Sequence, residues 1–222
     1  MPFAKVTSVR QETSFVKVIS LDLRLDFKPG QFVMLGIPGY VDKIGKGPKR
    51  AYSIASAPGD LLEFVVKINP VPSFSSSVGE LKVGDVVTVD GPFGKFVLEG
   101  VKENRVFIAS GTGIAPIMSM IRYAVKQENC PKLCLLFGVK VLQECILKKE
   151  LDVLSAKGVI DVVYCLSREE RSGFVHGRVT SVLDKYVSSE NEVYICGSPE
   201  MVKDVVAVLL SLGVERIFKE QW

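Results

Sequence analysis

Three candidate strand ends in the second half of the chain carry residues suited to phosphate or ring binding. The segment Ser110-Gly111-Thr112-Gly113-Ile114-Ala115-Pro116 follows a candidate strand at Arg105 to Ala109 and precedes a helical stretch. Glycine permits close backbone approach, proline suits the first turn of a helix, and free N–H groups at a helix start favour a pyrophosphate. The loop lacks the third glycine of the dinucleotide fingerprint, so a plain strand-to-helix turn is the alternative.

The other two strand ends offer a thiol and a guanidinium. Cys196 closes the run Val193 to Cys196 and is followed by Gly197, while Ser167 and Arg168 close another strand candidate. In a parallel sheet, ligands bind at the carboxyl ends of the strands, so these groups are expected to meet in one crevice. The alternatives are a small buried hydrophobe for the cysteine and a solvated surface charge for the arginine.

The first half contains a second possible ligand site. In Arg50-Ala51-Tyr52-Ser53, strand geometry places Arg50 and Tyr52 on one face, and a flat aromatic beside a guanidinium suits a ligand with a ring and a phosphate. Ser75 and Ser76 lie in a serine run that opens a short helix, where hydroxyls and N–H groups suit another phosphate. The alternatives are a core position for Tyr52 and a plain N-cap for the serines.

The elements that position these residues follow two patterns. Up to about Gly100, apolar and polar residues alternate in short bursts separated by Gly and Pro, which predicts an antiparallel barrel or sandwich. Beyond Lys102, buried strands alternate with amphipathic helices, which predicts a parallel sheet covered by helices on both faces. We therefore expect two domains, 1–100 and 101–222, with the boundary between Gly100 and Glu103.

Composition excludes several classes of protein. The 222 residues carry a formal charge of only +3, without the basic excess of a nucleic-acid binder. The single histidine, His176, argues against histidine-rich metal centres and hydrolytic triads, and we expect no metal site. Five cysteines without paired hook spacing predict reduced thiols in a cytoplasm. No stretch reaches the roughly 20 apolar residues of a membrane helix, so no membrane span is expected.

Taken in order, the motifs resemble those of the ferredoxin-NADP reductase family of flavoproteins. They are the Arg-x-Tyr-Ser strand, the serine-led helix before Leu81-Lys82-Val83-Gly84-Asp85, Gly91-Pro92-Phe93-Gly94, Gly-Thr-Gly-Ile-Ala-Pro and Cys-Gly-Ser-Pro-Glu-Met. The resemblance covers almost the whole chain. It implies a six-stranded antiparallel Greek-key barrel that binds flavin, followed by a parallel-sheet α/β domain that binds the nicotinamide nucleotide.

The resemblance also implies a flavin site. The residues carried over are Arg50, Tyr52, Ser53, Val66, Lys67, Ile68, Ser75 and Ser76. In this family the arginine and the helix serines hold the pyrophosphate, and the tyrosine packs against the isoalloxazine or ribityl chain. The strand serine lies near flavin N5, and the backbone of the three consecutive residues lines the flavin. This double grip on the phosphates implies FAD.

The nicotinamide site and the chain end follow from the same resemblance. The residues carried over are Gly111, Thr112, Gly113, Ser167, Arg168, Cys196, Gly197, Glu220 and Trp222. The glycine loop would hold the dinucleotide pyrophosphate, with Cys196 and Gly197 beside the nicotinamide. The Ser-Arg pair matches the one that favours NADP, although Glu169 directly after it leaves NAD as the alternative. At the end, Glu220 would assist proton exchange and Trp222 would cover the flavin, unless the end is a frayed tail.

The expected activity is flavin-dependent electron transfer between NAD(P)H and a one-electron carrier such as ferredoxin. One alternative is the reductase subunit of an oxygenase or multi-subunit oxidoreductase, and another is a nucleotide-binding regulatory module without turnover. A basic segment with Lys43, Lys46, Lys49 and Arg50 is compatible with docking an acidic carrier, or is simply a solvated loop. The sequence leaves the oligomeric state open.

Overall fold

The computed structural model describes residues 2–41, 47–100 and 104–222. The chain divides into two compact units, Met1–Leu98 with Met118–Tyr123 and Glu99–Ile117 with Ala124–Trp222. Residues 101–103 of the expected boundary lie outside the described ranges. One helical turn from the second half of the sequence groups with the first unit, which a single boundary near Gly100 does not anticipate.

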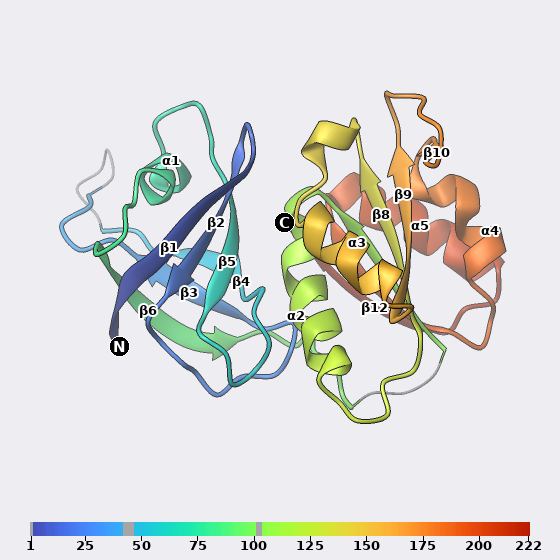
Figure 1. Ribbon diagram of the computed structural model, residues 1–222, viewed down its shortest axis with the longest axis horizontal. Coiled ribbons are helices and arrows are strands. Elements are labelled where there is room, and N and C mark those ends of the chain that lie inside the picture. Colours follow the sequence, from blue (N-terminus) through green and yellow to red (C-terminus); the bar gives the residue numbers. More distant parts are fainter. Residues whose placement is uncertain (1, 42–46, 101–103) are drawn as a thin grey trace. The chain divides into compact units, whose positions relative to one another are not determined.

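The first unit is a six-stranded antiparallel sheet with a barrel-like curvature and one short helix (Figure 1). Its elements are β1 Phe3–Thr13, β2 Val16–Leu21, β3 Phe32–Gly36, β4 Arg50–Ser53, β5 Glu63–Lys67, α1 Phe74–Gly79 and β6 Val86–Phe93. The strand order is β4-β3-β6-β1-β2-β5. Between the end strands, the described residues form only an isolated bridge at Ile54 and Phe64, so the barrel is not closed. We call this gap between β4 and β5 the open seam.

Period-two alternation explains these strands. In β1, Phe3 and Lys5 are exposed while Ala4 and Val6 are buried, as expected for a strand with one face on a core. The inward side chains form one apolar cluster that includes Leu21, Val33, Phe64 and Val66. The alternating residues of the first half therefore predicted the strand type, and the structure shows which face of each strand is buried.

The second unit is a six-stranded parallel sheet with the order β10-β9-β8-β7-β11-β12. Its strands are β7 Arg105–Ser110, β8 Leu133–Val139, β9 Ile160–Leu166, β10 Val175–His176, β11 Glu192–Gly197 and β12 Arg216–Gln221. Its helices are η1 Gly111–Gly113, α2 Ile114–Val125, η2 Leu142–Glu144, α3 Lys148–Ala156, η3 Val179–Val182, α4 Leu183–Tyr186 and α5 Pro199–Ser211.

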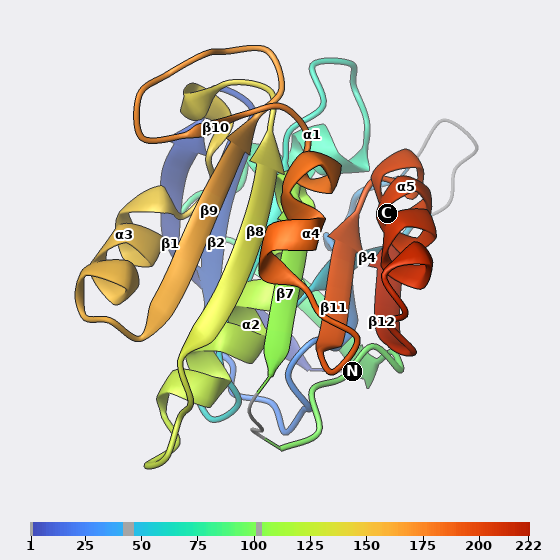
Figure 2. The ribbon, with the colours of Figure 1, turned by 90° about the vertical axis from the view of Figure 1, so that its right-hand side faces the viewer.

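Helices cover both faces of this sheet (Figure 2). On one face, η3, α4 and α5 supply Val182, Leu183, Val205 and Leu209 to a core shared with the strands. On the other face lie α3 and the start of α2. Within the described part of the chain, no helix is long and apolar enough to cross a bilayer.

The first strand of this unit, β7, lies between β8 and β11, so the strand order reverses beside it. Such a reversal opens a crevice at the carboxyl ends of the two strands, because the connections leave in opposite directions. Here the ends are Ser110 of β7 and Gly197 of β11. The fold therefore brings the glycine loop and the Cys196 strand together, as the sequence predicts.

The opposite end of the sheet is held by a buried ion pair. Arg105 Nε lies 2.8 Å from Glu192 Oε2, and these side chains are 2% and 9% exposed. The other guanidinium nitrogens of Arg105 donate to the carbonyls of Gly100 and Glu99, at 2.5 and 3.0 Å. A buried charge is tolerated when it is paired and hydrogen-bonded in this way. Arg105 thus fixes the start of the second unit to its sheet.

Candidate functional sites

The strand β4 presents the predicted arginine, tyrosine and serine with different exposure. Arg50 is exposed and its Nη1 donates to the Lys49 carbonyl at 3.0 Å, so its head is available to a ligand phosphate. Ser53 ends the strand and is 9% exposed, opposite Phe32 of β3. The basic segment is described only in part: Lys49 pairs with Asp90 at 3.1 Å, while Lys43 and Lys46 lie outside the described residues.

Tyr52 lies between the two interpretations that the sequence allows. It is paired with Val33 in the β3–β4 register and packs against the core of the first unit while remaining partly exposed. Burial raises the pKa of its hydroxyl to about 12, against a smaller lowering by the Arg50 charge. The ring is therefore neutral at physiological pH and held from one side by the core, so a flavin contact would use its remaining surface.

The end of β5 offers backbone groups to the open seam. Leu21 N donates to the Leu62 carbonyl at 2.9 Å and Ile68 N to the Phe15 carbonyl at 2.7 Å, so the even-numbered residues of this stretch pair with the β2 side. Backbone hydrogen bonding alternates from side to side along an antiparallel strand. The N–H and C=O of Val66 therefore face β2, whereas those of Lys67 face the open seam. Of the three predicted residues, Lys67 has the backbone best placed to meet a flavin.

The helix α1 begins with a capping box. The Ser76 hydroxyl accepts from Ser73 N at 2.8 Å and donates to the Ser73 carbonyl at 2.7 Å, while Ser76 N donates to Ser73 Oγ at 3.3 Å. Ser75 Oγ lies 3.1 Å from Ser73 Oγ. The plain N-cap alternative therefore accounts for the Ser76 hydroxyl. What remains for a phosphate is the hydroxyl of Ser75 and, in the first turn, the amides of Phe74 and Ser75, because the Ser76 amide is bonded to Ser73.

In the second unit, the glycine loop fits a bound pyrophosphate. A Cβ on Gly113 would lie 2.3 Å from the Cys196 carbonyl oxygen, so only glycine allows η1 to approach β11 this closely. Gly111 has a positive φ of 53°, and no described atom lies within 4 Å of its Cβ position. Thr112 is partly buried between them. The loop is thus packed on one side and open on the other, as a phosphate cradle must be.

Cys196 lies under this loop and is fully buried. It is paired in register with Ala109 on β7 and with Glu220 on β12. Burial raises the pKa of its thiol, the nearby Glu220 carboxylate raises it further, and a hydrogen bond with Trp222 opposes both. Cys196 is therefore a neutral thiol, which positions a ligand by packing and weak hydrogen bonding. All five cysteines are free.

The chain end is held against the same strand. Trp222 N donates to the Gly197 carbonyl at 3.3 Å, and the side chain, which is 50% exposed, hydrogen-bonds with Glu220. Among the described residues, Glu220 Oε2 is the buried side-chain oxygen without a partner. Burial raises the pKa of this carboxyl from 4.5 to about 7, against a smaller lowering by Trp222. An orphaned oxygen beside Cys196 marks a place where a ligand donor or a proton belongs. The chain end is therefore not frayed.

Ser167 and Arg168 extend β9 along the end of β8. Their amides donate to the carbonyls of Val139 and Lys140 at 3.0 and 2.9 Å, and the Arg168 side chain is exposed. The Glu169 carboxylate accepts from Leu142 N at 2.8 Å, so it is already engaged with the backbone. Of these two charged side chains, the Arg168 guanidinium is therefore the one that faces solvent.

Two polar residues of α2 form long-range contacts that the sequence did not predict. Ser119 and Arg122 lie one turn apart in an otherwise apolar helix, and both bond to residues that follow β4. Their spacing of three on one helix face was the available signal. Elsewhere, no group of three or more His, Cys, Asp or Glu side chains in the described ranges could hold a metal ion.

Two family profiles match the chain. The oxidoreductase FAD-binding domain matches residues 3–98, and the oxidoreductase NAD-binding domain matches residues 107–207. Each profile thus falls on one of the two candidate sites described above.

Curated relatives are longer than this chain. It is 34% identical over 213 residues to the reductase component of propane 2-monooxygenase from Mycolicibacterium smegmatis, across 89% of this chain and 58% of that protein. It is 30% identical over 222 residues to the electron transfer component of toluate 1,2-dioxygenase from Pseudomonas putida, across 96% and 64%. The chain spans less than two thirds of either relative.

Solved structures share the fold. The FAD/NAD-binding domain of nitric oxide dioxygenase from Vibrio cholerae O1 biovar El Tor aligns with a TM-score of 0.88 and 23% identity, over 99% of this chain and 98% of that one. A ferredoxin NADP+ reductase from Neisseria gonorrhoeae, solved with FAD and NADP bound, aligns with a TM-score of 0.85 and 24% identity over the same shares. At these identities the likeness establishes the fold.

Proposed function

Because the chain belongs to the ferredoxin-NADP reductase family of flavoprotein oxidoreductases, we propose that it moves electrons between NAD(P)H and a one-electron carrier through FAD. The balance is simple: one NAD(P)H gives up a hydride, two carriers each gain one electron, and one proton is released. FAD supplies the step between two-electron and one-electron chemistry, and the protein supplies binding and orientation. Residues 1–100 and 101–222 are the proposed FAD and NAD(P) domains.

The observation that carries this proposal is the crevice between β7 and β11. It combines a glycine loop whose Gly113 must be glycine, an open face above Gly111, a buried thiol at Cys196 and an unpartnered oxygen on Glu220. A mere strand-to-helix turn requires no open face and no orphaned carboxylate. This set suits a dinucleotide whose pyrophosphate contacts the loop and whose ring reaches the thiol.

In the first unit, we assign the flavin pyrophosphate to Arg50, Ser75 and the first-turn amides of α1. The guanidinium is exposed and not bonded to a carboxylate in any contact described above, so it can form charge-assisted hydrogen bonds to phosphate. Tyr52 would pack against the isoalloxazine or ribityl chain. The Ser53 hydroxyl would hydrogen-bond near flavin N5, and the Lys67 backbone would line the ring at the open seam.

In the second unit, the loop of Gly111, Thr112 and Gly113 would bind the pyrophosphate, and Cys196 with Gly197 would flank the nicotinamide. Arg168 and Ser167 would bind the 2′-phosphate of NADP. We favour NADP because the Glu169 carboxylate is held by Leu142 N and the Arg168 guanidinium faces solvent. NAD remains the competing cofactor in the test below.

Glu220 is proposed to handle the proton. With a pKa near 7, its carboxyl group exists in both forms at physiological pH, and Oε2 can hold or release a proton beside Cys196. Trp222 shields this carboxyl by its hydrogen bond. Its ring would cover the flavin and would move away as the nicotinamide enters.

The carrier is proposed to be ferredoxin or a similar separate protein, in a cytoplasm. A reductase component of an oxygenase is the second candidate, favoured by the two relatives that carry such names. Steady-state reduction of ferredoxin alone, compared with reduction of a co-purified oxygenase component, separates the two.

The central experiment combines cofactor extraction with turnover. The purified protein should contain or take up FAD, show flavin absorbance, and reduce dyes or ferredoxin faster with NADPH than with NADH. A colourless protein that does not take up FAD would contradict the whole proposal. Efficient turnover with NADH only would reverse the cofactor assignment and leave the rest standing.

A further inference from the structure

A turn of α2 is built into the first unit. Residues Met118–Tyr123 group with the β-sheet unit, although they come from the second half of the sequence. Ser119, which is fully buried, donates from Oγ to the Ser56 carbonyl at 2.7 Å. One turn later, Arg122 Nη1 donates to the Ala55 carbonyl at 2.8 Å. Two side chains on one helix face thus bind two successive carbonyls.

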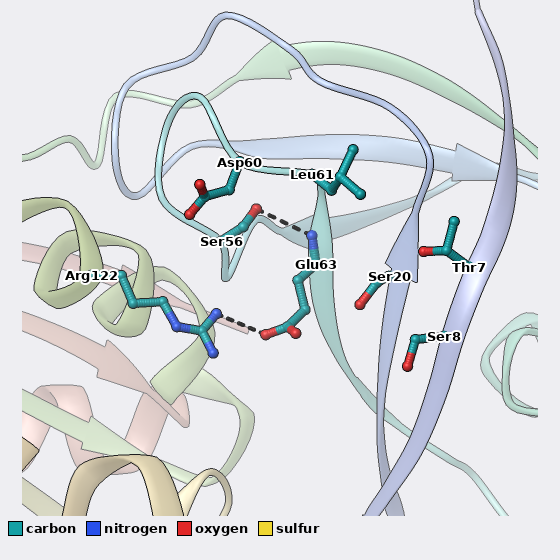
Figure 3. Close-up of a pocket in the computed structure, with 8 residues that line it drawn as sticks. All are labelled: Thr7, Ser8, Ser20, Ser56, Asp60, Leu61, Glu63 and Arg122. Carbon is teal, nitrogen blue, oxygen red and sulfur yellow. Dashed lines mark hydrogen bonds and ion pairs between the residues drawn. The ribbon is translucent and has the colours of Figure 1, made fainter. Parts of the chain in front are cut away.

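The same guanidinium bonds a carboxylate on β5. Arg122 Nη1 lies 2.7 Å from Glu63 Oε1, and these side chains are only 17% and 16% exposed (Figure 3). Glu63 in turn bonds the segment after β4, since its amide donates to Ser56 Oγ at 3.1 Å and its carbonyl accepts from Ala55 N at 2.8 Å. The network therefore joins α2, β5 and residues 54–56, which we call the β4 junction.

The β4 junction begins directly after Ser53. It includes Ile54, which forms an isolated bridge with Phe64 across the open seam. Because this part of the barrel lacks a continuous ladder, the side chains from α2 supply hydrogen bonds that strand pairing does not. A shift of the junction would move Ser53 with it, since one peptide bond separates them.

We propose that Ser119 and Arg122 are positioning residues that fix the β4 junction, and through it the Ser53 hydroxyl in the flavin site. This inference rests on the proposed function for its catalytic consequence, but its structural part concerns the protein without cofactor. Arg122 acts through the Ala55 carbonyl and touches neither flavin nor nicotinamide in this assignment. Glu63 orients the guanidinium and neutralises its charge.

A pocket beside the network makes the proposal testable by chemical rescue. It has a volume of about 410 Å³, and Arg122, Glu63 and Ser56 line it together with the hydroxyls of Thr7, Ser8 and Ser20 (Figure 3). In the register, Ser8 pairs with Ser20 and Ser20 with Glu63, so a polar row leads to the ion pair. Arg122→Ala would enlarge this pocket, and a free guanidinium ion can then enter and replace the lost group.

The first measurement uses the protein without FAD. In Arg122→Ala, hydrogen exchange at the amides of Ala55 and Glu63 should accelerate by about tenfold or more, because both amides are bonded within the network. Millimolar guanidinium chloride, far below denaturing concentrations, should restore the protection. Arg10→Ala is the matched control, because Arg10 forms an exposed ion pair with Glu12 at 2.6 Å in the same unit.

The second measurement uses the FAD-loaded protein. Arg122→Ala should lower kcat about tenfold and shift the visible circular dichroism of the flavin, while the KM for NADPH and the Kd for FAD change little. Guanidinium should restore kcat in Arg122→Ala and leave Arg10→Ala unaffected. Glu63→Gln keeps a group that can accept from Arg122 and should give a smaller loss than Arg122→Ala.

Ser119 is tested against a second helix serine. Ser119→Ala removes the hydrogen bond to the Ser56 carbonyl. Like Arg122→Ala, it should accelerate hydrogen exchange at the β4 junction, and it should cause part of the same loss of kcat. Ser211→Ala is the control, because Ser211 Oγ donates within α5 to the Val208 carbonyl at 2.7 Å and is exposed. It should change neither.

Two results would overturn the inference. Unchanged hydrogen exchange at the Ala55 and Glu63 amides in both Arg122→Ala and Ser119→Ala would show that the β4 junction is stable without the α2 side chains. Faster exchange without a flavin dichroism shift or a kcat loss would show that the junction does not position Ser53. If the wild-type protein binds no FAD, the proposed function fails instead, and the exchange experiment still decides whether the network fixes the junction.

Discussion

At the scale of single residues, Glu220 has a strongly shifted ionisation. Its pKa rises from 4.5 to about 7 on folding, chiefly through burial, so the folded protein binds this proton more tightly than the unfolded chain. Between these two pH values the unfolded chain is ionised while the folded protein is still protonated. The stability contribution of this group therefore falls as pH rises from about 4.5 to about 7, and is constant above that.

The prediction is a difference between two pH profiles. Glu220→Gln removes the titration, so the Tm of the wild type should fall relative to that of the variant between about pH 4.5 and about pH 7. Thermal unfolding of both proteins across this range measures it. Parallel profiles would mean that Glu220 titrates near its ordinary value in the folded protein.

Arg168 carries a prediction about cofactor choice. If its exposed guanidinium binds the 2′-phosphate, Arg168→Ala should raise the KM for NADPH about tenfold or more, the cost of a lost charge-assisted hydrogen bond. The KM for NADH should change little, because NADH lacks this phosphate. Equal effects on both cofactors would remove Arg168 from the 2′-phosphate site.

Residue types alone identified part of the candidate site. The carboxyl end of a strand placed Cys196 correctly in the crevice, since only its position in the fold mattered. The pairing of Cys196 with Glu220 could not be predicted, because it depends on the register between β11 and β12. Ser76 was assigned to a ligand, yet its hydroxyl is engaged by Ser73, and only the capping geometry reveals this.

At the scale of elements, the glycine loop separates packing from binding. A Cβ on Gly113 would lie 2.3 Å from a backbone oxygen, whereas one on Gly111 would meet open space at a positive φ. Gly113→Ala should therefore lower the free energy of unfolding of the second unit by about 1–3 kcal/mol. Gly111→Ala should cost only about 1 kcal/mol, from its left-handed backbone.

The two variants also differ in binding. In Gly111→Ala the new methyl group enters the proposed pyrophosphate space, so NADP+ affinity should fall far more than stability does. Denaturant unfolding and calorimetric titration with NADP+ measure the two quantities. If Gly111→Ala binds NADP+ like the wild type, the open face is not the phosphate site.

The elements followed from the sequence where periodicity was clear. Alternation in the first half and strand-helix repetition in the second gave the correct sheet types, because each pattern matches only one kind of burial. The open seam was not foreseen, since a missing ladder between β4 and β5 depends on the curvature of the whole sheet. The direction of the Val66 backbone groups was not foreseen either, because it depends on which residues of β5 form hydrogen bonds with β2.

At the scale of the whole molecule, the buried pair of Arg105 and Glu192 belongs to the second unit alone. Arg105→Met leaves the Glu192 carboxylate without its 2.8 Å partner in a site that is 9% exposed. Breaking a buried pair costs about 3–5 kcal/mol when the remaining charge is uncompensated. Here the loss should lie at or below the lower end of that range, because Arg216 Nη1 still lies 3.2 Å from Glu192 Oε1. The double variant Arg105→Met with Glu192→Met should recover part of the loss.

The two units offer separate probes for this prediction. The single tryptophan, Trp222, lies in the second unit, so its fluorescence reports unfolding there. Release of FAD, judged by flavin fluorescence, reports the first unit. In urea, Arg105→Met should shift the tryptophan transition to lower concentration and leave FAD release nearly unchanged. A matching shift in both would mean that the units unfold together.

The division of the molecule was only partly visible in the sequence. The residue pattern changes near Gly100, but the structural division does not fall at that point alone. A turn of α2 belongs to the first unit through Ser119 and Arg122. Local periodicity describes α2 as one amphipathic helix. It contains no information on which side chains meet a partner 63 residues away in the sequence, as Ser119 and Ser56 do.

The open seam has a consequence for handling the protein. β5 is an edge strand of its sheet, and its outward backbone groups near Lys67, beyond the bonds that Glu63 forms with Ala55 and Ser56, are a template on which another chain can pair. In the site proposed here, FAD would cover the Lys67 backbone at that edge. Protein stripped of its cofactor is therefore expected to self-associate and to lose solubility, and supplying FAD during expression and storage is expected to keep it dispersed.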